Sequence, residues 1–242
     1  MTTTDAVPAA CADTRSGRTM TTIDFHPTVF ADIDVYRPQD DSWLLCRAID
    51  ESGVVPGARI LDMCTGTGII AIHAAQLGAR RVDAFDIAPA AVACARDNAE
   101  STGTTVQVRS GSFDEARVHG PYDVVLCNPP YVPSDSLPSG LGMTRAWDAG
   151  PEGRHVLDVL CATAPVLLDD GGTLLLVQSE FADPAKTLRM LCDNGFDAAE
   201  VLEHTIGYGP VMTSRAAWLE ETCKANKGQR TERLVVIRAD KR

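Results

Sequence analysis

Asn128-Pro129-Pro130-Tyr131 is the stretch whose residue types point most directly to chemistry. It follows an apolar run, residues 122–127, with the pattern of a buried strand. Two successive prolines lack the N–H groups of a sheet ladder, so we expect the strand to end at Asn128. The Asn128 carboxamide oxygen and the carbonyls of residues 128 and 129 then form a fork of acceptors for a planar –NH2, on which Tyr131 can stack. Taken alone, the tetrapeptide fits a strand-ending turn with an Asn cap equally well.

Two other features are typical of sites that hold a nucleoside. The glycine-rich turn Cys64-Thr65-Gly66-Thr67-Gly68 lies between a predicted strand and a predicted helix, where a ligand can approach the backbone closely. Asp86 lies about 20 residues beyond Gly66, where an acid commonly binds ribose hydroxyls. Asp86 alone is equally well a helix cap before Pro89. Together the two features indicate a nucleoside-containing cofactor, without separating NAD from S-adenosylmethionine (SAM).

The acceptor fork at Asn128 separates these two cofactors. A dehydrogenase has no need of such a fork, whereas methyl transfer to a planar –NH2 does. An amide nitrogen is a poor nucleophile because its lone pair is delocalised, so catalysis must come from fixing it in line with the methyl–sulfonium bond. This chemistry needs no side-chain base, and we assign none.

The elements that must position these residues alternate along the chain. Strands are expected at 59–63, 81–87, 105–109, 122–127, 173–178, 196–204 and 233–238. Helices are expected from Asp40-Asp41-Ser42, whose side chains would cap the first turn, and at 69–77, 89–100, 151–168, 183–193 and 214–225. This order predicts an α/β fold, a doubly wound, seven-stranded, mostly parallel sheet with an antiparallel last strand. The glycine-rich turn, Asp86 and Asn128 would share the edge formed by the carboxyl ends of the strands.

Composition narrows the class of protein. The 242 residues and the ordinary apolar content predict one domain, preceded by a disordered lead-in at 1–22 that is neither signal peptide nor membrane anchor. Met20 is an alternative start. Eight dispersed cysteines without a CxxC pair indicate a reducing cytoplasm, and neither they nor the histidines suggest a metal site. A formal charge of −11 argues against nucleic acid as a partner.

Asp62-x-x-x-Gly66-x-Gly68, Asp86 and Asn128–Tyr131 together resemble class I SAM-dependent methyltransferases of the HemK/PrmC type. These enzymes methylate a glutamine amide in the Gly-Gly-Gln loop of translation termination (release) factors. Residues 35–43 (VYRPQDDSW) and 146–154 (AWDAGPEGR) are similar to segments of the eukaryotic/archaeal HemK branch. The similarity covers about residues 33–204 and the last strand, which implies a Rossmann-like methyltransferase domain at 23–242.

The resemblance also implies roles for particular residues. Asn128 and the Pro129 carbonyl would hold the substrate amide, with Tyr131 beside it. Asp86 would bind the ribose hydroxyls of SAM with Ile87 next to it, and Ser112 and Phe113 would border the adenine. The methionine part would lie among Tyr36, Asp41, Ser42, Asp62, Cys64, Thr65, Gly66 and Gly68. The alternative role for Tyr36 is simple packing. The alternative role for Trp147 is that of an aromatic side chain that anchors the core or the loop.

The chain departs from the family pattern at two places. Cys64 replaces the first glycine of the usual turn, and a positive φ there would be strained. Residues 205–230 are longer than in this branch, and we expect them to form a lid or substrate-selecting wall; the alternative is a helix that covers a sheet edge. Deleting 207–226 should change the choice of substrate and leave SAM affinity intact.

Four functions remain open from the sequence. The first is a protein-glutamine methyltransferase acting on a protein such as a release factor. The second is a methyltransferase for the exocyclic amine of adenine in nucleic acid, against which the acidic composition counts. The others are a methyltransferase for a small molecule or peptide and a SAM-binding partner protein without catalysis. Members of the eukaryotic branch pair with a small activating subunit, and the sequence leaves open whether this chain needs one.

Overall fold

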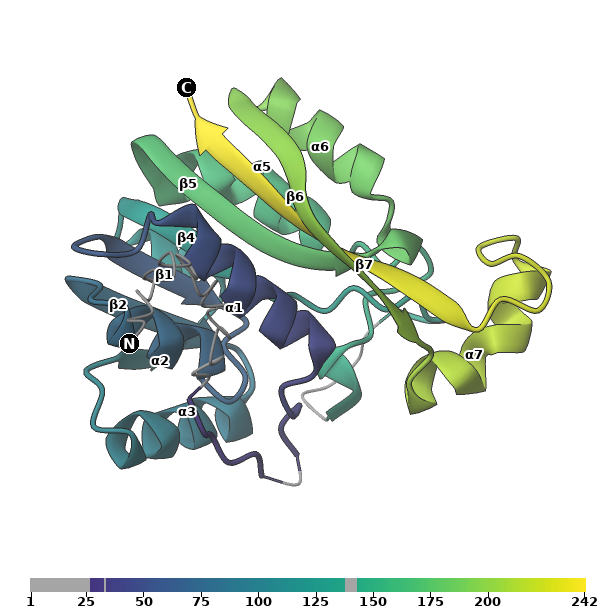
Figure 1. Ribbon diagram of the computed structural model, residues 1–242, viewed down its shortest axis with the longest axis horizontal. Helices are drawn as coiled ribbons and strands as arrows, with labels where there is room; N and C mark the ends of the chain where they lie inside the picture. Colours follow the sequence, from purple (N-terminus) through teal and green to yellow (C-terminus); the bar gives the residue numbers. More distant parts are fainter. Residues whose placement is uncertain (1–26, 33, 138–142) are drawn as a thin grey trace, which may run out of the picture.

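A seven-stranded sheet forms the centre of the molecule in the computed structural model, which describes residues 27–32, 34–137 and 143–242. The strand order is β3-β2-β1-β4-β5-β7-β6 (Figure 1). β7 pairs antiparallel with β5 and β6, and the remaining pairs are parallel. The expected doubly wound sheet with an antiparallel last strand is confirmed. The predicted lead-in, 1–22, lies outside the described residues.

The elements alternate as expected. The strands are β1 (Arg59–Met63), β2 (Arg81–Asp86), β3 (Gln107–Ser110), β4 (Tyr122–Cys127), β5 (Leu168–Ser179), β6 (Phe196–Gly207) and β7 (Thr231–Lys241). The α-helices are α1 (Asp40–Ser52), α2 (Ile69–Gln76), α3 (Pro89–Ser101), α4 (Phe113–Arg117), α5 (Leu157–Leu167), α6 (Pro184–Asp193) and α7 (Pro210–Glu221), with short 3-10 helices η1 (Met143–Ala146) and η2 (Glu180–Ala182).

Helices cover both faces of the sheet. α2 lies against β1 and β2, α3 against β2 and β3, and α1 packs beside α2 and reaches β5, β6 and β7 (Figure 1). α5 packs against β4, β5, α4 and α6. The central strands are almost wholly apolar because both of their faces are buried, as Leu61, Val125, Leu175 and Ile237 illustrate.

The strand register sets the position of the site. Met63, the last residue of β1, lies opposite Phe85 of β2 and Cys127 of β4. The residues that follow, Cys64, Asp86 and Asn128, therefore emerge at one edge of the sheet. This is the edge at which α/β proteins bind ligands.

Several predicted boundaries were wrong. Helix α5 begins at Leu157 instead of 151, since Gly150 and Gly153 adopt positive φ angles of 75° and 66° and form turns. Strand β5 begins at Leu168, ahead of Gly171-Gly172, because the register with β4 shifts between Tyr122 and Val124 and the glycines occupy that irregularity. Helix α7 spans Pro210–Glu221 instead of 214–225, with Pro210 suited to a first turn.

One short helix was missed. α4 begins after Ser112, whose hydroxyl accepts from the Asp114 N–H while the Glu115 carboxylate accepts from the Ser112 N–H. The Ser-x-x-Glu pattern at 112–115 is the sequence signal of this capping box.

The second half of the sheet ends in an arm. β6 and β7 pair along their whole length, from Phe196↔Lys241 to Gly207↔Thr231, and carry α7 beyond the sheet (Figure 1). Residues 205–230 thus form the end of this arm.

Candidate functional site

A cavity of about 270 Å³ opens at the carboxyl ends of β1, β2 and β4. Thirteen of the residues predicted for the site line it: Tyr36, Asp41, Ser42, Cys64, Thr65, Gly66, Asp86, Ile87, Ser112, Phe113, Asn128, Pro129 and Tyr131. The other two, Asp62 and Gly68, lie behind its wall. The structure therefore brings segments from four strand ends, the three named and that of β3, together with the start of α1 to one cavity.

The turn after β1 forms the cavity floor. Cys64 has φ 59°, Gly66 φ 53° and Gly68 φ 82°, so all three adopt the left-handed conformation. Glycine adopts it without steric cost, whereas Cys64 is strained there. A Cβ at Gly66 would meet no atom within 4 Å, but one at Gly68 would lie 3.1 Å from the Ala95 Cβ. Gly66 thus leaves open space, and Gly68 lets α2 and α3 pack closely.

Asp62 supports this turn from within the protein. Its side chain is buried, and Oδ2 accepts from the Thr65 hydroxyl at 2.5 Å and from the Ala71 N–H at 3.2 Å. Burial raises the pKa of Asp62 to about 7, although these two hydrogen bonds favour the charged form. In this structure Asp62 connects the turn to the first turn of α2.

Asp86 spans the cofactor side of the cavity. Its Oδ2 accepts from the Gly66 N–H at 3.0 Å and its Oδ1 from the Ala88 N–H at 2.9 Å. Burial raises the pKa of Asp86, and the N–H groups of Ala88 and Gly66 offset part of this shift. The Asp86 carboxylate thus joins the glycine-rich turn to the segment that follows β2. Each of its oxygens keeps a lone pair that can accept a hydrogen bond from a ligand.

Asn128 lies directly after the end of β4 and lines the cavity. Asn128 Nδ2 donates to the Ser42 hydroxyl at 3.4 Å, and the side chain is only partly buried. Because the amino group points to Ser42, the carboxamide oxygen is the free end. Asn128 and Pro129 both line the cavity, so two acceptors are available there.

Asp41 connects α1 to this fork. Its Oδ1 accepts from the Ser42 N–H at 2.6 Å and the Ser42 hydroxyl at 3.2 Å. Its Oδ2 accepts from the hydroxyls of Tyr36 at 3.2 Å and Tyr131 at 3.0 Å. Helix α1 begins at Asp40 with Asp40 and Asp41 in its first turn, as predicted, but the N-cap position is Gln39, which makes no side-chain cap. Asp41 instead organises the site.

The described parts of the 129–150 loop, residues 129–137 and 143–150, lie against each other beside the cavity. The Val132 N–H donates to the Trp147 carbonyl at 2.8 Å and the Ala149 N–H to the Val132 carbonyl at 3.0 Å. The lining is completed by η1 and the segment after it, by the segment that leads into α5 and by α5 itself, with Arg145, Trp147, His155 and Val159. Sequence reasoning assigned no role to Arg145, His155 or Val159, since only the folding of the loop brings them to the strand ends.

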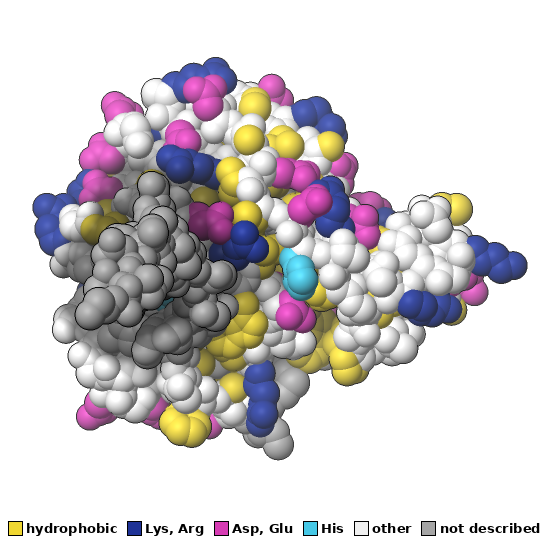
Figure 2. Space-filling view, viewed as in Figure 1, with side chains coloured by type: hydrophobic (Ala, Val, Ile, Leu, Met, Phe, Trp, Pro, Cys, Tyr) yellow, Lys and Arg dark blue, Asp and Glu magenta, His cyan; other side chains and the backbone are white. Residues whose placement is uncertain are grey.

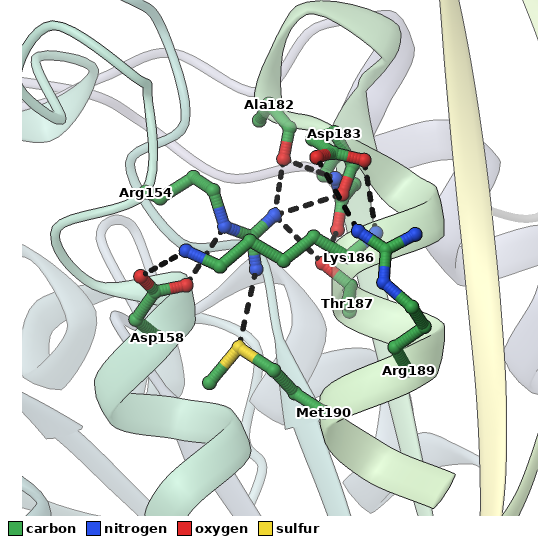
Figure 3. Close-up of polar contacts among 9 residues, drawn as sticks. Arg154, Asp158, Ala182, Asp183, Lys186, Thr187, Arg189 and Met190 are labelled. Atoms are coloured by element: carbon green, nitrogen blue, oxygen red, sulfur yellow. Dashed lines mark hydrogen bonds and ion pairs between the residues drawn. The ribbon is translucent and has the colours of Figure 1, made fainter.

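Arg154 anchors the end of this loop (Figure 3). Its guanidinium, only 4% exposed, pairs with the Asp158 carboxylate at 2.7 Å and donates to the carbonyls of Ala182 and Asp183 and to the Thr187 hydroxyl. Lys186 pairs with the second Asp158 oxygen at 2.8 Å. The network holds the residues beside His155 against η2 and the start of α6.

Arg215 joins the arm to the same loop. From α7 it donates to the Pro133 carbonyl at 2.9 Å and pairs with Asp148 at 2.5 Å. Pro133 lies two residues after Tyr131, and Asp148 lines the cavity. α7 is therefore tied to the wall on the acceptor side of the site.

The residues present fit a nucleoside-containing cofactor. Thr67 lines the cavity, and its buried hydroxyl has no hydrogen-bond partner among the described residues. Gly66 leaves space for close approach, and the Asp86 oxygens can accept from hydroxyls. A ligand with hydroxyl and charged groups would satisfy these atoms.

The described residues contain no group of three or more His, Cys, Asp or Glu side chains placed to bind a metal ion. None of their helices is long and apolar enough to cross a membrane. Cys46, Cys94, Cys127 and Cys161 are buried as expected, whereas Cys192 and Cys223 are exposed, and every described cysteine is a free thiol.

Comparison with known proteins identifies the family. The model of the methyltransferase small domain matches residues 21–141, half of the chain. A putative protein N5-glutamine methyltransferase of Methanocaldococcus jannaschii is 33% identical over 166 residues, covering 67% of this chain and 81% of the relative.

Two further matches extend the comparison. A release factor glutamine methyltransferase of Deinococcus radiodurans is 36% identical over 59% of this chain, which spans about half (52%) of that relative. The structure of Mtq2 from the E. cuniculi Mtq2–Trm112 complex, responsible for methylation of the termination factor eRF1, matches with a TM-score of 0.58 and 22% identity, covering 87% of this chain and 100% of that chain. The chain belongs to the methyltransferase small domain family and is a methyltransferase of the HemK/PrmC type.

Proposed function

We propose that this protein transfers a methyl group from SAM to the side-chain amide nitrogen of a glutamine in a protein. The observation that carries the proposal is the orientation of Asn128, whose amino group donates to Ser42 and whose carboxamide oxygen is therefore free in the cavity. That oxygen and the Pro129 carbonyl can accept both N–H groups of one planar –NH2.

The cofactor would occupy the side of the cavity formed by the glycine turn. Asp86 would accept from the ribose hydroxyls, Ile87, Ser112 and Phe113 would border the base, and Gly66 and Thr67 would meet the methionine part. When bound, SAM supplies an activated methyl group and its own leaving group.

Positioning is the contribution of the chain itself. Asn128 and Pro129 hold the two N–H groups, so the lone-pair face of the acceptor nitrogen is directed across the cavity. In the transfer an N–C bond forms, the S–C bond breaks with its electrons left on sulfur, and the nitrogen loses one proton. An N-protonated amide is a strong acid, so water can take that proton without a side-chain base.

The acceptor that we propose is a release factor with a Gly-Gly-Gln loop. The relatives in M. jannaschii and D. radiodurans are named for glutamine and for release factors, and the E. cuniculi complex is described as methylating eRF1. In that structure the methyltransferase is paired with Trm112, so we also propose a small activating subunit for this chain.

The decisive experiment uses methyl-labelled SAM and a release factor with an intact Gly-Gly-Gln loop. We expect label on this factor and none after its glutamine is changed to alanine, in reactions run with and without a Trm112-type subunit. The Asn128→Ala variant should bind SAM with unchanged affinity by calorimetry and transfer no label. Label on the glutamine-to-alanine factor would refute the proposal.

A nucleic-acid acceptor is the matched control. Adenine presents a similar amine, but Lys and Arg are interspersed with Asp and Glu on the face shown in Figure 2, and the net charge is −11. We therefore expect no label on adenine-containing DNA or RNA.

A further inference from the structure

The carboxamide of Asn128 is useful only in one of its two orientations. Its oxygen must face the acceptor, because an –NH2 turned into the cavity would oppose the –NH2 of the substrate. The two orientations have nearly the same shape, so a hydrogen-bond partner has to select between them. That partner is the Ser42 hydroxyl, 3.4 Å from Asn128 Nδ2.

A hydroxyl alone would not select, since it both donates and accepts. The Ser42 hydroxyl, however, has its proton committed, because it donates to Asp41 Oδ1 at 3.2 Å. It can therefore only accept from Asn128, which binds the amino end and leaves the carboxamide oxygen free.

Asp41 is in turn held as an acceptor by the donors around it. The Ser42 N–H reaches Oδ1 at 2.6 Å, and the Tyr36 and Tyr131 hydroxyls reach Oδ2 at 3.2 and 3.0 Å. Burial raises the pKa of Tyr131 and of Tyr36, so both hydroxyls keep their protons and donate. Asp41 is only 4% exposed, so water does not compete for these contacts.

We propose that Asp41, acting through the Ser42 hydroxyl, fixes the orientation of the Asn128 carboxamide, and that Asp41 and Ser42 are positioning residues for methyl transfer. The inference deepens the proposed function and rests on it for the identity of the reaction. Tyr131 shares the same carboxylate, so both ends of the Asn128–Tyr131 segment are tied to the first turn of α1.

Three substitutions separate this role from simple packing or a cofactor contact. Asp41→Asn keeps the volume but can turn an amino group toward Ser42, whose hydroxyl would then donate to Asn128 and reverse it. Ser42→Ala removes the selecting hydroxyl and leaves Asp41 in place. Ser42→Thr keeps the hydroxyl, and Glu51→Gln, an exposed residue paired with Arg47 on the same helix, is the control.

Turnover is measured on the glutamine acceptor at saturating SAM. Asp41→Asn and Ser42→Ala should lower kcat by about tenfold to a hundredfold, the size of a lost orienting contact, and this loss should persist when the SAM concentration is raised further. Ser42→Thr should recover most of kcat, and Glu51→Gln should equal the wild type. Unchanged kcat in Ser42→Ala, or a loss that higher SAM removes, would overturn the proposal.

A second readout does not depend on turnover. In the 15N-labelled protein the Asn128 side-chain amide signal, identified by its loss in Asn128→Ala, should shift and exchange faster with water in Ser42→Ala and stay unchanged in Glu51→Gln. If Ser42→Ala leaves this signal unchanged, the proposal that Ser42 orients the Asn128 carboxamide is wrong. If the wild type methylates no glutamine, the proposed function fails, and this readout still decides the orientation.

Discussion

Alanine substitutions at Gly66 and Gly68 form a matched pair: the first should mainly weaken SAM binding, and the second should mainly lower the free energy of unfolding. Both have positive φ, 53° and 82°, so alanine at either position carries a backbone cost of about 1 kcal/mol. Their surroundings differ. The new Cβ at Gly66 would meet nothing within 4 Å, whereas at Gly68 it would lie 3.1 Å from the Ala95 Cβ and 3.3 Å from its Cα.

The structure therefore sets the size of each effect. The new Cβ at Gly68 would crowd Ala95 in α3, including its backbone, so α2 and α3 would have to move apart to accommodate it. Such overpacking typically costs about 1–3 kcal/mol in addition to the cost of the positive φ angle. We expect Gly68→Ala to lower the free energy of unfolding by about 2–3 kcal/mol and Gly66→Ala by about 1 kcal/mol. The Gly66 methyl would instead stand in the cavity, and SAM affinity should fall by at least about tenfold.

Urea unfolding at fixed pH measures the first quantity, and calorimetry with SAM measures the second. Gly68→Ala should retain SAM affinity within a few-fold in its folded fraction. If Gly66→Ala binds SAM like the wild type, or is destabilised as much as Gly68→Ala, the assignment of Gly66 to the cofactor wall and Gly68 to helix packing is refuted.

Three further predictions concern charged groups. Burial raises the pKa of Asp62 to about 7 from an unfolded value near 4, so the folded state binds the proton more tightly and the contribution of Asp62 to stability should fall as pH rises from about 4 to 7. The wild type should therefore lose unfolding free energy relative to Asp62→Asn between pH 5 and pH 8, and an unchanged difference between the two proteins in urea unfolding would contradict this. Arg154→Met should cost about 3 kcal/mol of unfolding free energy by leaving the buried carbonyls of Ala182 and Asp183 unpaired and Asp158 with Lys186 alone, whereas the exposed Arg189→Met should cost almost none. Arg215→Ala should raise the acceptor KM and leave SAM affinity unchanged, with the exposed Arg230→Ala as control; a loss of SAM affinity in Arg215→Ala would refute this role for α7.

The cofactor side of the site was predictable because its residues follow strands directly. Parallel strands end at one edge, so Gly66, Asp86 and Asn128 had to meet once the strands were recognised. The free end of the Asn128 carboxamide was not predictable, since it depends on Ser42, 86 positions away in the chain. Arg154 stood in a recognised segment, but its role as a buried anchor comes from contacts with α6 and η2 that no local pattern encodes.

The residues at strand ends and the residues positioned by contacts distant in sequence form different walls of the cavity, and this division bears on the choice of acceptor. The turn after β1 and the Asp86 strand end are held by the carboxylates of Asp62 and Asp86, which accept from N–H groups of the turn and of the segments beside it, and this leaves little freedom for change. The opposite wall, which includes Asp148 and His155, is held by Arg154 and Arg215. The contacts of Arg154 with oxygen atoms of η2 and α6 lie 28 to 33 positions away in sequence, and those of Arg215 lie 67 to 82 positions away. Long side chains that bind carbonyls tolerate changes in the residues between their anchoring points. Substitutions in α7 and the loop should therefore alter the choice of acceptor while the Asn128 fork and the cofactor wall keep their geometry.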